Sequence, residues 1–175
     1  YGVGQSGAIK LVKLDVFGNT VWQRTLDAAT DDITYSAVQG PDSSYYIVGG
    51  AENTGGAGGD AFILKVDANG TDVWRKTYSG AGTDLLKGVS FATDGNLFAV
   101  GTTGSQAGNA EDVLLLKVNA STGDIIWSET YGSTGNERGF VVSGTPDGGA
   151  LIGGAQNPAA SFSYLYAVKV NSVGT

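Results

Sequence analysis

Lysine, tryptophan and acidic side chains recur at fixed spacing in this 175-residue sequence, and these residue types could carry chemistry. The lysines lie 52 residues apart, at Lys13, Lys65, Lys117 and Lys169. The tryptophans lie 52 and 53 residues apart, at Trp22, Trp74 and Trp127. A recurrence of this kind predicts a repeat protein in which each series occupies one equivalent structural position.

Two acidic series follow the same register. The first lies seven residues after the threonine of each Trp-x-x-Thr segment, at Asp32, Asp84 and Glu137. The second follows ten residues later, at Asp42, Asp94 and Asp147. We expect the first series in loops along one rim, with Asp60 and Asp112 near it, and such oxygen ligands suit Ca²⁺. The alternative, which we favour because there is no dense Asp-x-Asp-x-Asp loop, is that each carboxylate accepts backbone N–H groups in a turn.

The lysine and tryptophan series are predicted to be structural. A lysine among apolar strand residues pairs with an acid or extends its charge to solvent, because an isolated buried ammonium is costly. One tryptophan in each repeat can pack between neighbouring sheets, and the alternative is a platform on which a ligand stacks. The glycine-rich segments 54–59 and 104–110 lack the Lys-Ser/Thr of phosphate-binding loops, so we interpret them as plain loops.

Composition argues against several classes of function. The chain has no His, Cys or Met and a formal net charge of −7. Without His and Cys it lacks the commonest general base and every thiol nucleophile, so we predict that it is not an enzyme. The negative charge argues against nucleic acid as a partner. The sequence contains no apolar stretch of about 20 residues, so we do not expect membrane insertion. The lack of residues prone to oxidation favours an extracellular or cell-surface location.

Each period of about 52 residues predicts four β-strands. GVSFAT and NLFAVG are joined by Asp-Gly, while DVLLLKVN and IIWSETY are joined by ASTGD, whose counterpart DANG contains an Asn-Gly that suits a type I′ turn. No helical periodicity is present, and 29 glycines favour tight turns. We therefore expect an all-β fold, a β-propeller of four-stranded antiparallel blades with about three blades present. Residues 1–29 would form a partial blade, 30–80 and 81–132 two complete blades, and 133–175 an incomplete blade.

The repeated residues resemble the β-propeller repeats of secreted and surface proteins of bacteria and archaea. In one repeat the resemblance is carried by Asp94, Gly95, Asn96, Gly101, Asp112, Lys117, Trp127, Thr130, Tyr131 and Gly132. In the preceding repeat it is carried by Gly49, Asp60, Lys65, Asp67, Trp74, Thr77 and Tyr78. The resemblance covers essentially the whole chain and implies the fold without assigning a function. VNASTGDIIW (118–127) also resembles the tryptophan-docking motif of quinoprotein-type propellers, but their cofactor-binding and metal-binding residues have no counterparts here.

The sequence thus predicts a structural or interaction module of an exported protein, in adhesion, surface-layer or filament assembly. The alternatives are a carbohydrate- or ligand-binding propeller, with a glycan as its ligand, and a fragment of a quinoprotein-like enzyme. Asn69 and Asn119 begin N-glycosylation sequons. About three blades do not close a ring, so we expect the remaining blades to come from a longer chain or from identical subunits, which also allows a filament.

Calcium binding at the rim of Asp32, Asp84 and Glu137 is expected to be weak at most, because turn capping already uses the carboxylates. Calorimetric titration with Ca²⁺ should give little heat, and thermal unfolding should be the same with and without a chelator. A large loss of thermal stability in chelator would instead show that these carboxylates hold a structural Ca²⁺.

Overall fold

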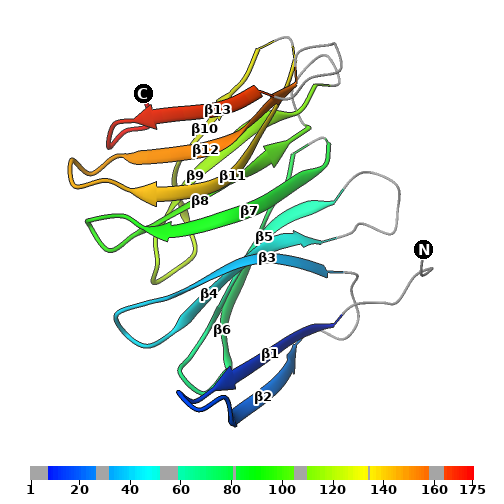
Figure 1. Cartoon of the computed structure of the whole chain (residues 1–175), viewed down its shortest axis with the longest axis vertical. Helices are drawn as coiled ribbons and strands as arrows, with labels where there is room; N and C mark the ends of the chain where they lie inside the picture. Colours follow the sequence, from blue (N-terminus) through cyan, green and yellow to red (C-terminus); the bar gives the residue numbers. More distant parts are fainter. Residues whose placement is uncertain are drawn as a thin grey trace.

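The computed structural model describes residues 8–26, 32–51, 59–80, 82–104, 110–133, 135–157 and 164–175. Over these residues the protein is all-β, as expected, with thirteen strands and no helix (Figure 1). None of the described residues therefore forms a helix able to cross a membrane.

The strands form four antiparallel sheets in chain order. The first sheet contains β1 (Ile9–Leu14) and β2 (Thr20–Leu26). The second contains β3 (Asp32–Gln39), β4 (Tyr45–Ala51), β5 (Asp60–Val66) and β6 (Asp72–Tyr78). The third contains β7 (Asp84–Phe91), β8 (Leu97–Thr103), β9 (Asp112–Val118) and β10 (Ile125–Tyr131). The fourth contains β11 (Asn136–Gly144), β12 (Ala150–Asn157) and β13 (Tyr164–Val170).

Each sheet is a meander, because strands that follow one another in the chain are hydrogen-bonded neighbours. Successive sheets are stacked, with β7 packed against β3 and β4, and β11 packed against β7 and β8 (Figure 1). The turns between β3 and β4, β7 and β8, and β11 and β12 lie at the same end of the stack in Figure 1. Equivalent strands of the repeat thus occupy equivalent places in successive sheets.

The core consists of apolar layers between successive sheets. Strand β9 illustrates the arrangement, because Leu114 and Leu116 pack toward the second sheet whereas Val113 and Leu115 pack toward the fourth. A strand covered on both faces needs a nearly continuous apolar run rather than an alternating pattern. The sequence VLLLKV in β9 and the sequence AFILKV in β5 satisfy this requirement.

The turn between β5 and β6 differs from the expected type I′ turn. Asn69 does not adopt a positive φ, whereas Gly70 has φ +78°. The Gly70 N–H donates to the Asp67 carbonyl, and the Asp67 carboxylate accepts the N–H groups of Asn69 and Thr71. The aspartate side chain therefore stabilises a type I turn that is followed by a left-handed glycine, a common three-residue hairpin loop.

Glycine at this turn position is required by both backbone and packing. Gly123, the counterpart of Gly70 in the third sheet, has φ +77°, and a Cβ there would lie 3.0 Å from the Trp74 ring. Gly95 has a similar φ of +81° but no heavy atom within 4 Å of the added Cβ. The two positions therefore separate backbone strain from contact between sheets.

We predict that Gly95→Ala lowers the free energy of unfolding by about 1 kcal/mol, the cost of a left-handed alanine. Gly123→Ala is expected to cost a further ~1–3 kcal/mol, because the methyl group pushes against the Trp74 ring. Urea unfolding of both variants measures the difference. Equal losses would show that the turn does not press on the tryptophan.

Candidate functional site

The three tryptophans occupy equivalent positions in the last strands of the first three sheets. In the strand register Trp22 lies opposite Lys13, Trp74 opposite Lys65 and Trp127 opposite Lys117, and in each case the pairing shifts by one residue next to the tryptophan. A β-bulge of this kind bends the strand and redirects its side chains. The predicted equivalence of the tryptophan series is confirmed by these registers.

Each tryptophan packs on a turn of the following sheet. An added Cβ at Gly70, Gly123 or Gly174 would approach the ring of Trp22, Trp74 or Trp127, respectively, to between 3.0 and 3.2 Å. Aromatic residues of β4 and β8 complete the layer, with Tyr46 6.1 Å from Trp74 and Phe98 5.8 Å from Trp127 between ring centroids. The rings thus serve inter-sheet packing, as the structural interpretation of the series predicts.

Hydrogen bonds from aromatic side chains to backbone carbonyls fasten the same contact. The indole N–H of Trp22 donates to the Ala68 carbonyl at 3.0 Å, and that of Trp127 donates to the Ser172 carbonyl at 3.3 Å. The hydroxyls of Tyr78 and Tyr131 donate to the carbonyls of Gly123 and Gly174, and burial raises the pKa of both hydroxyls, that of Tyr131 to about 12. Both tyrosines therefore remain protonated donors at neutral pH and well above it.

The middle interface uses a different donor. The Tyr46 hydroxyl donates to the Ala120 carbonyl at 3.0 Å, while Trp74 Nε1 has no acceptor among the described residues. Ala120 is the counterpart of Ala68 and Ser172, and the residue that matches Tyr46 in the third sheet is Phe98, which has no hydroxyl. The Tyr46 hydroxyl thus donates to the carbonyl whose counterparts accept the indole N–H in the two neighbouring interfaces.

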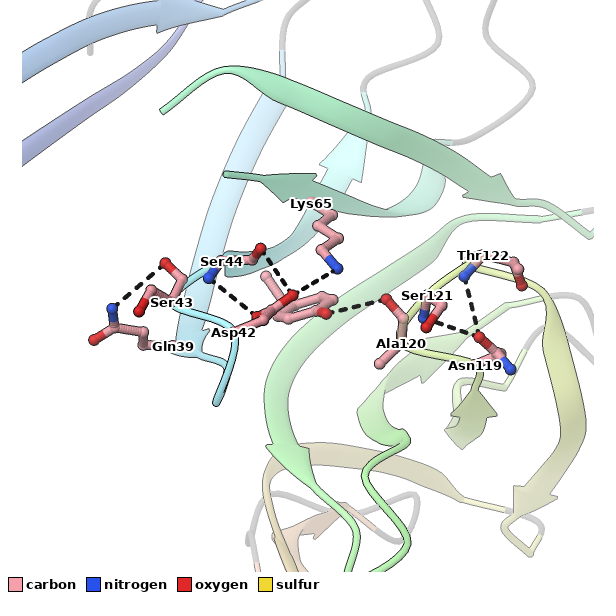
Figure 2. A network of polar contacts seen from close by, with 10 residues as sticks. Gln39, Asp42, Ser43, Ser44, Lys65, Asn119, Ala120, Ser121 and Thr122 are labelled. Carbon is pink, nitrogen blue, oxygen red and sulfur yellow. Dashed lines mark hydrogen bonds and ion pairs between the residues drawn. The ribbon is translucent and has the colours of Figure 1, made fainter. Parts of the chain in front are cut away.

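The lysine series pairs with the second acidic series. Lys65 Nζ lies 3.0 Å from Asp42, Lys117 Nζ 2.7 Å from Asp94, and Lys169 Nζ 2.8 Å from Asp147. Figure 2 shows the first of these pairs, in which Asp42 also accepts hydrogen bonds from the N–H and hydroxyl of Ser44. The ammonium groups of Lys13, Lys65 and Lys117 also lie 5.0–5.7 Å from the ring centroids of Tyr45, Tyr46 and Phe98.

The ion pairs change the acidity of the aspartates. The Lys169 ammonium holds the pKa of Asp147 far below its usual value. Burial acts to raise the pKa of Asp42 and Asp94, but hydrogen bonds from Lys65 and Ser44 to Asp42, and from Lys117 and Asn96 to Asp94, together outweigh it and lower both. Lys65, Lys117 and Lys169 thus each form an ion pair within their own sheet, and the 52-residue spacing from Asp42 to Asp94 was the sequence signal for the partners.

The calcium candidates lie at the start of the first strand of the second, third and fourth sheets, where Asp32 and Asp84 begin β3 and β7 and Glu137 is the second residue of β11. Asp84 Oδ2 accepts the Gly80 N–H at 2.7 Å, and Glu137 accepts the N–H and hydroxyl of Ser133. Asp32 instead forms an ion pair with Arg75 at 2.7 Å. Within the described part of the chain, no group of three or more acidic side chains is arranged to hold a metal ion. Two of the three carboxylates thus cap turns, and calcium binding stays a prediction.

The carboxylates of Asp112 and Glu137 interact electrostatically near the same rim. Burial raises the pKa of Asp112, and the charge of Glu137 raises it further. Burial also acts to raise the pKa of Glu137, but hydrogen bonds from Ser133 and Gln156 hold it below its usual value. Asp112 Oδ1 is buried without a hydrogen-bond partner among the described residues. The proton therefore resides more readily on Asp112 than on Glu137.

Two further sequence predictions concern loops. Asn69 is exposed, whereas Asn119 is half-buried and its Oδ1 accepts the N–H groups of Ser121 and Thr122 (Figure 2). Glycosylation of either residue stays a prediction. The glycine-rich segments 54–59 and 104–110 lie outside the described residues except at their edges.

The outward faces of the first and fourth sheets expose apolar side chains, as expected of blades that lack a neighbouring blade, although no individual residue was predicted. On the fourth sheet Leu165 is 91% exposed and Leu151 48% exposed, although their counterparts in the third sheet, Val113 and Phe98, are fully buried. On the first sheet Val12 and Leu14 are 46% and 54% exposed. Their counterparts in the second sheet, Leu64 and Val66, are buried. Each of the four exposed residues lies one repeat length from its buried counterpart, so the repeat spacing alone would have identified them.

Comparison with models of protein families gives no match for this chain, and comparison with curated proteins gives none either.

We predict that Tyr46→Phe changes the free energy of unfolding by less than about 1 kcal/mol, because Trp74 Nε1–H can then donate to the Ala120 carbonyl. Tyr78→Phe, the matched change in the same interface, should cost ~1–3 kcal/mol, because it leaves the buried Gly123 carbonyl without its donor. Urea unfolding gives both values, and the indole N–H resonance of Trp74 should shift in the first variant only. Equal losses with an unmoved resonance would contradict the donor exchange.

Asp112→Asn is expected to stabilise the protein at pH 7. A pKa that is raised on folding means that the ionised carboxylate destabilises the folded state, and this penalty disappears as the pH falls below the unfolded value near 3.8. The variant should therefore unfold at higher urea concentration than the parent at pH 7, with the two converging toward pH 3. A pH-independent difference would mean that the amide acts through packing alone.

Proposed function

We propose that this chain is a segment of a β-propeller and serves as a non-catalytic interaction module of an exported or cell-surface protein. Three observations support the propeller: the sheets have four strands where they are complete, they are meanders, and they stack face to face in chain order. The lack of His and Cys supports a non-catalytic role, and the lack of Cys and Met is consistent with an oxidising exterior. Adhesion, surface-layer and filament assembly are the contexts that suit such a module.

The module is completed, in this proposal, by further sheets of the same kind at its two outward faces, supplied by other blades of a longer chain or by a second copy of this chain. The observation that carries the proposal is the exposure of Leu165, Leu151, Val12 and Leu14 at positions whose counterparts are buried inside the chain. The chain itself therefore provides the template for what covers each face. The outward face of the fourth sheet would pack against a further sheet in the same way as the Val113 face of the third sheet packs against the fourth.

The two faces differ, so the assembly is head to tail. The outward face of the fourth sheet corresponds to the face of the second sheet that packs against the third, and to the face of the third sheet that packs against the fourth. The outward face of the first sheet corresponds to the face of the second sheet that packs against the first. Contacts between two different patches form rings if the rotation closes and filaments if it does not.

Sedimentation velocity over a concentration series is the test. The parent chain should associate, whereas Leu165→Lys and Val12→Lys should each remain monomeric, because a charge in one of the two faces blocks every contact between identical copies. Val73→Lys is the control, because Val73 is 53% exposed, close to the 46% of Val12, but lies on β6 of an internal sheet. Its association should match that of the parent.

A mixture of the two blocked variants distinguishes head-to-tail contact from other modes. Leu165→Lys retains its first-sheet face and Val12→Lys retains its fourth-sheet face, so the mixture should form a heterodimer and nothing larger. A parent chain that remains monomeric at all concentrations would refute self-assembly. Mixed variants that remain monomeric while the parent associates would refute the head-to-tail contact.

A further inference from the structure

Four equivalent turns, which follow strands β1, β5, β9 and β13, differ in whether a tryptophan ring covers them. Their glycines are Gly18, Gly70, Gly123 and Gly174, and all four have a left-handed φ between +77° and +87°. The last three glycines are buried, each beneath the ring of the preceding sheet's tryptophan. Gly18 is exposed, and a Cβ added there would meet no heavy atom of the described residues within 4 Å. The turn of the first sheet is therefore the uncovered member of the series.

This uncovered turn already has the conformation that holds a ring in the other sheets. The Gly18 N–H donates to the Asp15 carbonyl at 3.1 Å. The Asp15 carboxylate accepts the N–H groups of Phe17 and Asn19, both at 2.9 Å, in the same pattern as in the turn of the second sheet. All of these bonds lie within the turn, so little ordering is required when a ring binds.

Two carbonyl groups of the same turn lack the donors that their counterparts have. The Val16 carbonyl is the counterpart of the two carbonyls that accept an indole N–H, those of Ala68 and Ser172. The Gly18 carbonyl is the counterpart of the two that accept a tyrosine hydroxyl, in the turns of the third and fourth sheets. Among the described residues neither the Val16 nor the Gly18 carbonyl accepts a hydrogen bond. The turn thus offers one acceptor to an indole and another to a phenol.

The matching donors in this chain lie four residues apart on the last strand of a sheet. Strand β6 carries Trp74 and Tyr78, and β10 carries the same pair one repeat later. Strand β2 carries Trp22 but has a leucine at the tyrosine position. The ring is therefore common to all three contacts and supplies most of the buried surface, whereas the tyrosine adds a hydrogen bond in two of them.

A second copy of this chain has no free ring to place on the Gly18 turn. The sequence contains three tryptophans, and each of them already lies on a turn of its own chain. Association of identical copies would cover the exposed side chains of Val12 and Leu14 but would leave this turn open. The occupant must carry a tryptophan of its own.

We propose that residues 15–19 bind the last strand of another blade, through a tryptophan that packs on Gly18 and donates its N–H to the Val16 carbonyl. A tyrosine four residues later on that strand donates its hydroxyl to the Gly18 carbonyl. The inference rests on the part of the proposed function in which a further sheet packs on the first sheet, at one end of the stack (Figure 1). It narrows that sheet to one with a Trp-x-x-x-Tyr strand, which a second copy of this chain does not supply.

A cyclised hairpin with the sequence of residues 112–131 is the probe, because it presents Trp127 and Tyr131 on a strand that is already paired. It is titrated into the Leu165→Lys variant, whose first-sheet face is intact and whose copies do not compete for it. The α-protons of Gly18 should shift upfield and show cross-relaxation to the indole protons of the hairpin. The glycines of the three covered turns should not shift, and they serve as the internal reference.

Two protein variants and two hairpin variants locate the contact. Gly18→Ala should weaken binding roughly tenfold or more, because the methyl group presses on the incoming ring. Gly95→Ala is the matched control and should leave the affinity unchanged, because Gly95 has a similar φ of +81° and is likewise free of contacts within 4 Å. In the hairpin, Trp127→Leu should abolish saturable binding, and Tyr131→Phe should weaken it about fivefold by removing one hydrogen bond.

The inference is overturned if the hairpin gives no saturable shift at Gly18, if its Trp127→Leu form binds equally well, or if Gly18→Ala and Gly95→Ala bind it alike. These failures are distinct from a failure of self-assembly. A parent chain that associates while its Gly18 turn ignores the hairpin would keep the assembly and refute the tryptophan site. Hairpin binding by a chain that never associates would keep the site and refute self-assembly.

Discussion

The contact on which the rest of the structure depends is the packing of an aromatic side chain from one sheet on a glycine turn of the next. Trp22, Trp74 and Trp127 supply the ring, and the turn of the following sheet supplies a left-handed glycine that leaves room for it. The nearby indole and tyrosine donors reach carbonyls of the same turn. Large buried aromatic surface gives the contact its strength, and the hydrogen bonds fix its position.

This constraint explains why the sheets are so alike while their edges differ. A turn that must fit under a ring fixes the strand register on both sides, and the bulge next to each tryptophan follows from it. Positions that do not take part in the contact are free to change. The change from Tyr46 to Phe98 alters only which donor uses a carbonyl, whereas the change from Arg75 to Ser128 removes the guanidinium that pairs with the first acid of the sheet.

Much of this could be predicted from the sequence, because the repeat makes every feature appear several times. The spacing of the tryptophans and lysines predicted equivalent positions, and the strand and turn pattern of each period predicted an all-β fold. The structure confirms an all-β fold of antiparallel strands and pairs the lysines with acids.

The misses came from interactions that spacing alone does not encode. Asn69-Gly70 suggested a type I′ turn, but the Asp67 carboxylate accepts two backbone N–H groups and stabilises a type I turn instead. The acidic series Asp32, Asp84 and Glu137 looked uniform, yet its members have different partners, because Arg75 has no arginine counterpart in the third sheet. Differences between repeats, rather than their common pattern, thus determine the local chemistry.

The most direct test of the account is the proton NMR shift of the turn glycines. If the rings lie on the turns as described, the α-protons of Gly70, Gly123 and Gly174 should be shifted upfield by ring currents and should show cross-relaxation to the indole protons. Replacing Trp74 by leucine should return the Gly123 signals to ordinary positions while leaving those of Gly70 and Gly174 in place. Glycine α-protons at ordinary shifts in the parent chain, with no cross-relaxation to the tryptophans, would contradict the interlocked stack.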